Sequence, residues 1–237
     1  MLWKPRDIVS GDFPWFNHSE DQTLVVAADC TGHGVPGAFM SLIGHNGLLQ
    51  AVRQLRLTSP GAILDSLNHS VTHTLLSEEN GQQMRDGMDL AMCAIRREEK
   101  VLEFAGANNP LYILRRNLAS SELGSHPNIK CFEEHLGEIK GDKRPIGNYP
   151  GETQTSFTNH VIPFQPGDRF YIFSDGYADQ FGGPKGKKFM YKQFKRLLIS
   201  IFELPMAEQR KILNQTIMDW QGQQEQVDDI LIIGFAP

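Results

Sequence analysis

The hydrophobic residues of the chain recur with two different periods, which predicts both strands and helices. Short apolar or alternating runs predict strands at 1–13, 24–28, 89–96, 101–107, 111–116, 128–134, 153–163, 169–174 and 230–235. Apolar residues three to four positions apart predict helices at 38–57, 60–77, 191–202 and 206–221. The helices come in groups between runs of strands. This order favours an antiparallel α+β fold over an alternating parallel one.

Composition narrows the class of protein. No linker, repeat or low-complexity segment divides the 237 residues, so we expect a single domain over 1–237. No apolar run reaches the roughly 20 residues that cross a bilayer. The formal charge of −5, without a cluster of Lys and Arg, argues against nucleic-acid binding. Three cysteines without CxxC spacing favour a reducing compartment, so we expect a cytoplasmic protein. From the hydropathy and the charge, we expect neither a membrane nor a nucleic acid as a partner of this segment.

Aspartates stand at the ends of four predicted strands. Asp12 lies near the end of the first strand, Asp29 follows 24–28, and Asp175 follows 169–174. Asp228 and Asp229 precede 230–235. An aspartate at a strand end is commonly a local turn cap, so each of them alone is a weak signal. If these strands share one rim, however, the carboxylates converge and need a cation or protonation. Oxygen ligands without thiolates or paired histidines point to Mg²⁺ or Mn²⁺, with room for two ions.

Two further segments are candidates for binding. The glycine-rich run 29–37 (DCTGHGVPG) joins a predicted strand to a predicted helix and matches neither a Walker loop nor GxGxxG. Amides at the start of that helix can hold an anion, and a tight packing turn is the alternative. Lys185, Lys187 and Lys188 in FGGPKGKKF predict an exposed, solvated loop. The alternative is a basic flap that holds a phosphorylated partner.

Six segments follow one another over nearly the whole chain: RDIVSGDF, ADCTGHGVPGAFMS, GMDLAM, FAGANNPLY, FSDGYADQFGG and VDDILIIGF. Together they resemble the bacterial SpoIIE-type serine phosphatases of the metal-dependent protein phosphatase family (type 2C, PPM). The resemblance implies an αββα sandwich of two antiparallel sheets flanked by helices. It also implies hydrolysis of protein phosphoserine or phosphothreonine by a water that two Mn²⁺ or Mg²⁺ ions activate.

The resemblance implies a catalytic metal site as well. It assigns one ion to Asp12 and the Cys30 carbonyl and the other to Asp175 and Asp228, with Asp29 bridging both and Asp229 beside them. Many relatives have a histidine as general acid two residues after the bridging aspartate, but here Thr31 stands at that position and His33 follows. Arg6 is the nearest arginine for the phosphate, in a register that does not match. The acid that protonates the leaving group and the residue that binds the phosphate are therefore left unassigned. Asp89 has two possible roles, as a ligand of a third metal ion or as a cap at the start of its strand.

The resemblance also implies partners. In this group the phosphatase is usually the C-terminal output of a sensor protein, and its substrate is often a phosphorylated anti-sigma-factor antagonist. We therefore expect a substrate of that kind and an N-terminal sensor domain in a longer protein, and we leave a homodimer open. Two alternatives stay open: a catalytically silent module that binds phosphoproteins, and a metal phosphoesterase for small molecules. The intact carboxylates speak against the silent module.

Overall fold

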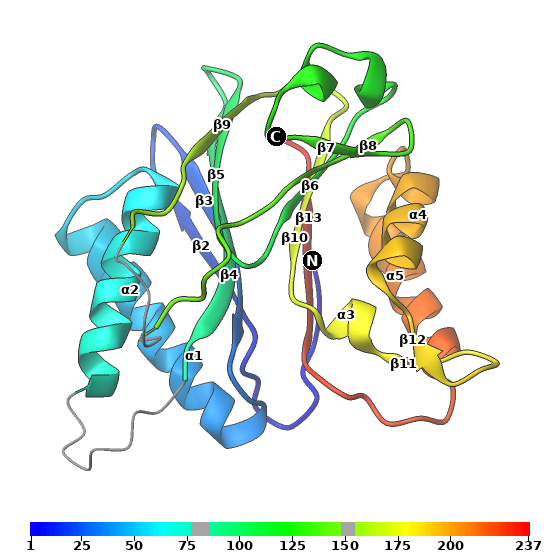
Figure 1. Ribbon diagram of the computed structural model, residues 1–237, viewed down its shortest axis with the longest axis horizontal. Coiled ribbons are helices and arrows are strands. Elements are labelled where there is room, and N and C mark those ends of the chain that lie inside the picture. Colours follow the sequence, from blue (N-terminus) through cyan, green and yellow to red (C-terminus); the bar gives the residue numbers. More distant parts are fainter. Residues whose placement is uncertain (77–85, 148–154) are drawn as a thin grey trace.

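The computed structural model describes residues 1–76, 86–147 and 155–237. Two antiparallel β-sheets pack face to face, and helices cover the outer face of each sheet (Figure 1). The resulting four layers confirm the antiparallel α+β fold that the hydrophobic pattern favours and the αββα sandwich that the resemblance implies. In the described part of the chain, no helix is long and apolar enough to cross a membrane.

The first sheet has the strand order β2, β3, β4, β5, β9. Its strands are β2 (Phe13–His18), β3 (Thr23–Cys30), β4 (Met88–Arg96), β5 (Val101–Ala107) and β9 (His160–Pro163). Two helices, α1 (Gly34–Leu49) and α2 (Pro60–Leu76), cover its outer face (Figure 1). A short π-helical turn, Gln50–Gln54, continues α1.

The second sheet has the strand order β1, β13, β10, β6, β8, β7. Its strands are β1 (Leu2–Lys4), β13 (Ile230–Phe235), β10 (Arg169–Phe173), β6 (Leu111–Leu114), β8 (Leu136–Ile139) and β7 (Lys130–Phe132). Helices α4 (Tyr191–Ile201) and α5 (Met206–Gln221) cover its outer face. Between β10 and α4 lie the short helix α3 (Gly176–Asp179) and a hairpin of β11 (Phe181–Gly182) and β12 (Lys187–Lys188).

Buried apolar side chains form three layers between the four layers of backbone. In β3, Leu24, Val26 and Ala28 pack toward α1 and α2, while Val25 and Ala27 pack toward the second sheet. A strand buried on both faces has to be apolar at successive positions, which explains the continuous run LVVAA. A third apolar layer joins the second sheet to α4 and α5.

The N-terminal segment differs from its prediction. Residues 1–13 form β1 and a loop, and β2 begins only at Phe13, so Asp12 precedes a strand and does not end one. The prediction of one strand there is wrong, because the amides of Arg6 and Gly11 donate to the Asp229 carboxylate and are not part of a strand ladder. Strand β9 is also shorter than the predicted strand 153–163. Residues 153–154 of that prediction lie outside the described residues, and so does residue 77, the last one of the predicted helix 60–77.

Antiparallel pairing brings strand starts and strand ends to a common rim. The end of β3 lies beside the start of β2, with Ala28 opposite Phe13. The end of β10 lies beside the start of β13, with Phe173 opposite Ile232. Both sheets present these ends at the lower edge in Figure 1. The aspartates that flank these strands therefore lie along one edge of the sandwich.

Candidate metal centre

The rim collects acidic side chains from segments far apart in the chain: Asp12, Asp29, Asp175, Asp228 and Asp229. The backbone N–H of Asp175 lies 3.4 Å from Asp29 Oδ2, which links the two sheets directly. Asp29 points toward the second sheet because side chains alternate along β3 and Val25 and Ala27 share its side. The structure thus brings together the aspartates that the sequence singles out.

Asp12 is buried at the centre of this group, with 2% of its surface exposed. Burial raises its pKa to about 8, a hydrogen bond with Ser174 opposes the rise, and the negative charge of Asp229 adds to it. Within the described residues its Oδ2 atom has no hydrogen-bond partner. A buried carboxylate oxygen without a partner is costly unless a cation or a proton neutralises it.

The other acids influence one another in the same way. Burial, followed by the charges of Asp12 and Asp175, raises the pKa of Asp29 well above its usual value. Burial, followed by the charge of Asp228, raises the pKa of Asp175 to about 6. The pKa of Asp228 is also raised, mainly by burial. Carboxylates crowded in this way favour a divalent cation among them.

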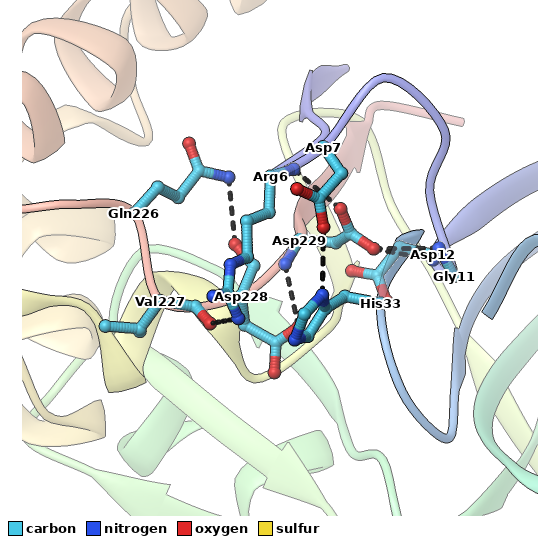
Figure 2. Close-up of polar contacts among 9 residues, drawn as sticks. All are labelled: Arg6, Asp7, Gly11, Asp12, His33, Gln226, Val227, Asp228 and Asp229. Carbon is cyan, nitrogen blue, oxygen red and sulfur yellow. Dashed lines mark hydrogen bonds and ion pairs between the residues drawn. The ribbon is translucent and has the colours of Figure 1, made fainter. Parts of the chain in front are cut away.

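Asp229 has a different environment (Figure 2). Its Oδ1 accepts a hydrogen bond from the Arg6 amide at 2.7 Å, and its Oδ2 accepts one from the Gly11 amide at 2.8 Å. The Asp12 amide lies 3.5 Å from the same Oδ2. Asp229 therefore fastens the loop between β1 and β2 to the start of β13 and places Asp12 at the rim.

Close backbone packing holds the glycine-rich loop against this site. A Cβ atom on Gly37 would lie 2.3 Å from the Gly32 carbonyl oxygen, and one on Gly11 would lie 2.5 Å from it, so neither position has room for a side chain. Cys30 ends β3 just before this loop. Its thiol is buried, and burial raises the thiol pKa, so the side chain is a poor thiolate ligand.

His33 and Asp7 form a pair at the edge of the site (Figure 2). His33 Nδ1 lies 2.9 Å from Asp7 Oδ2, and both side chains are about half exposed. Arg6 lies nearby, with Nη1 donating to the Val227 carbonyl at 2.8 Å. Positive charge on His33 or Arg6 would lower the pKa of Asp228, which places both next to the acids. Sequence reasoning missed Asp7, since nothing in RDIVSGDF marks it as the partner of a histidine 26 positions later.

Asp89 lies on the same rim. It stands opposite Asp29 in the pairing of β3 with β4. Its Oδ1 accepts a hydrogen bond of 2.8 Å from Asn108 Nδ2, and burial raises its pKa in spite of this bond. The carboxylate is therefore bonded to a side chain in the connection between β5 and β6.

The donor set fits a hard divalent cation. In residues 1–76, 86–147 and 155–237, no group of three or more His, Cys, Asp or Glu side chains is already arranged to hold a metal ion. The carboxylates therefore lie along the same rim but do not yet converge on one common position. The fit rests on the unpartnered, buried Asp12 oxygen and on the mutual repulsion of the other carboxylates. Carboxylate and carbonyl oxygens are the ligands that Mg²⁺ and Mn²⁺ prefer.

Comparisons with known proteins place the chain among phosphatases. The family described as Stage II sporulation protein E (SpoIIE) matches residues 19–236. The SiaA-PP2C domain of Pseudomonas aeruginosa is 31% identical, with a TM-score of 0.81, and the match covers 100% of this chain and 83% of that one. None of the curated proteins matches the chain.

Two more distant structures share the fold. The PP2C phosphatase domain with a fragment of the regulatory domain of SpoIIE from Bacillus subtilis is 16% identical, with a TM-score of 0.70, over 98% of this chain and 59% of that one. RsbX in complex with magnesium is 13% identical, with a TM-score of 0.59, over 98% of this chain and 90% of that one.

Proposed function

The chain belongs to the SpoIIE family of PP2C-type serine phosphatases, which are hydrolases, and we propose from this premise that it removes phosphate from phosphoserine or phosphothreonine of a regulatory protein with the help of two Mn²⁺ or Mg²⁺ ions. The observation that carries the proposal is the gathering of buried carboxylates at one rim, among them an Asp12 oxygen with no hydrogen-bond partner in the described residues. A module that only binds phosphoproteins has no need of such a costly arrangement.

We propose the ligand set that the family resemblance implies. Asp29 would be shared by both ions, Asp12 and the Cys30 carbonyl would hold one of them, and Asp175 and Asp228 would hold the other. We assign Asp228 as the ligand of the final pair, since the Asp229 oxygens already accept backbone hydrogen bonds. When bound, such ions lower the pKa of a shared water and neutralise charge on the phosphoryl oxygens.

The chain also offers a proton donor for the leaving group. Asp7 holds Nδ1 of His33, which leaves Nε2 to deliver a proton to the serine oxygen as the bond to phosphorus breaks. Thr31, at the position where many relatives have histidine, is engaged elsewhere: its hydroxyl donates to the Gly87 carbonyl at 3.1 Å. We therefore propose His33 as general acid and Asp7 as the residue that orients it.

We propose a biological setting that the family and the cysteines support. We infer one phosphatase domain over 1–237 that works as the output of a longer sensor protein, and we propose a phosphorylated anti-sigma-factor antagonist as substrate. All three cysteines are free thiols, which supports a location in the reducing cytoplasm. A panel of phosphorylated antagonist proteins, compared with unrelated phosphoproteins, tests the substrate. Equal rates for both groups would refute it.

Hydrolysis of p-nitrophenyl phosphate with Mn²⁺ and with EDTA tests the activity. The wild type is expected to turn over only with metal, and Asp29→Asn and Asp175→Asn are expected to lose at least ~100-fold in rate. Asp21→Asn, in the exposed turn between β2 and β3, is a matched control that keeps full activity. Unchanged rates in both site variants would refute the assignment. An inactive wild type would favour the silent module, and activity on small phosphate esters but not on phosphoproteins would favour the small-molecule enzyme.

A further inference from the structure

We propose that the β11–β12 hairpin, together with the apolar pocket beside it, docks the segment of the substrate protein that flanks the phosphoserine, and that this segment combines an apolar side chain with acidic ones. The inference rests on the proposed function and adds the class of sequence that the enzyme selects. It follows from the charge of the hairpin, the pocket that it borders and the continuity of both with the acidic rim.

The hairpin is a basic element in an acidic protein. Lys185, Lys187 and Lys188 lie within four positions of a chain whose net charge is −5. Lys188 Nζ is bound to Asp179 Oδ2 at 2.7 Å. Lys185 and Lys187 are exposed, and neither forms an ion pair with another described residue. Two exposed cations are therefore available to acidic groups of a partner.

A pocket of about 570 Å³ lies against the hairpin. Its apolar lining comes from Phe181, Pro184, Met190 and Trp220, and the three lysines are also among the residues that line it. Met190 is 56% exposed and has a φ of +73°, a backbone conformation that side chains other than glycine rarely adopt. A strained backbone that leaves a large apolar side chain in solvent is typical of a binding surface.

Hydrogen bonds and ring packing hold Trp220, which lines the pocket, against the hairpin. Its carbonyl accepts a hydrogen bond of 2.7 Å from the Gly183 amide, and its Nε1 donates to the Gln180 carbonyl at 3.1 Å. Its ring meets that of Phe189 edge to face, with 5.3 Å between centroids. A Cβ on Gly183 would lie 2.5 Å from the Trp220 ring, so only glycine allows this close packing. A preformed pocket keeps the ordering cost of docking low.

The hairpin is continuous with the acidic rim. Asp175 directly precedes α3, and Asp179 at the end of that helix is the residue that binds Lys188 of the hairpin. On the other side of the pocket, Tyr191 follows Met190, and its ring centroid lies 6.4 Å from that of Phe173, the residue that ends β10 at the rim. A chain segment that leaves the rim past Tyr191 therefore reaches the pocket and then the lysines.

Synthetic phosphoserine peptides test the proposal. One series carries Leu and Asp residues within six positions of the phosphoserine, on either side, and its partner series carries Leu and Lys. With Mn²⁺ at low salt, the wild type is expected to have a kcat/KM about fivefold to tenfold higher for the acidic series, since each exposed charge pair contributes modestly. Added salt should reduce this preference. Lys185→Glu/Lys187→Glu should abolish or reverse it, while turnover of p-nitrophenyl phosphate, which has no flanking segment, stays unchanged.

A matched double variant controls for net charge. Lys100→Glu/Lys130→Glu changes the total charge equally at exposed positions in the β4–β5 turn and in β7, at the opposite end of the sandwich (Figure 1), and should keep the preference. For the pocket, acidic peptides with Leu replaced by Ser should be poorer substrates of the wild type, and Met190→Ser should remove that difference. An active wild type that treats both series alike would overturn the docking proposal alone. A wild type inactive on p-nitrophenyl phosphate would overturn the proposed function and the docking with it.

Discussion

Replacing Asp12 by asparagine tests the electrostatic cost of the acidic rim without measuring catalysis. The Asp12 carboxyl is buried with one oxygen unpartnered among the described residues, beside other acids. In metal-free protein its ionisation opposes folding, and asparagine removes the charge at nearly the same volume. We therefore expect Asp12→Asn to lower activity and yet make the metal-free protein less sensitive to alkaline pH.

The size of the effect follows from the pKa. Burial raises the pKa of Asp12 from 3.8 to about 8 in the folded chain. The folded carboxyl holds its proton more tightly, so its contribution to stability is fully present below pH 3.8 and is lost as the pH rises toward 8. At about 1.4 kcal/mol per pKa unit, the loss is roughly 2 kcal/mol at pH 5 and roughly 5 kcal/mol at pH 8. The difference of ~3 kcal/mol corresponds to about 6–12 °C in Tm for a domain of this size.

Thermal unfolding in EDTA at pH 5 and pH 8 measures this difference. Comparing the two pH values for each protein cancels any pH-independent effect of the new amide on packing. The Tm of the wild type should fall between the two pH values by about 6–12 °C more than that of Asp12→Asn. Asp21→Asn, an exposed aspartate in the β2–β3 turn, should behave like the wild type.

Added Mn²⁺ completes the experiment. At pH 8 it should raise the Tm of the wild type, since a ligand that binds only the folded state stabilises it by mass action, and it should raise the Tm of Asp12→Asn much less. Parallel pH profiles of wild type and Asp12→Asn in EDTA would refute the electrostatic reasoning. An equal response of both proteins to Mn²⁺ would refute the role of Asp12 as ligand.

Two further predictions concern residues around the rim and far from it. His33→Gln should lower kcat for a phosphoserine peptide by about 100-fold, and much less for p-nitrophenyl phosphate, whose phenolate leaves without a proton. Equal losses on both substrates would refute the general-acid role. Asp168→Asn should lower the free energy of unfolding in urea by about 3–5 kcal/mol, because the buried guanidinium of Arg115 donates hydrogen bonds to both oxygens of the Asp168 carboxylate and would lose this charged partner. An unchanged midpoint would contradict that estimate of the buried pair.

The sequence predicted the regular elements best where the hydrophobic pattern is long. Helix 206–221 and strand 230–235 have the predicted bounds, because each carries enough buried positions to show its period. The helix α3, with four residues, and the two-residue strands of the hairpin are too short to show any period. The basic segment 185–188 is predicted as an exposed loop, and its lysines at 185 and 187 are exposed. The pattern does not predict that Lys187 and Lys188 pair with Phe181 and Gly182. That hairpin packs against Trp220, which is far along the chain.

The acidic rim was predictable in outline, since aspartates next to buried strands meet wherever those strands share an edge. The partners of each carboxylate were not. Asp229 accepts hydrogen bonds from backbone amides 223 and 218 positions away, and no local pattern encodes them. The same holds for Asp7, whose pairing with His33 depends on how the N-terminal loop folds over the glycine-rich turn. The assignment of individual ligands stays a prediction.

Direct measurement of Mn²⁺ binding by titration calorimetry tests the central claim, that strand-end acids from both sheets form one divalent-metal site. We expect the wild type to bind two ions and Asp29→Asn to lose most of the affinity for both, because Asp29 lies between the two sheets. Binding by Asp29→Asn that equals the wild type, or no binding by the wild type, would contradict the account.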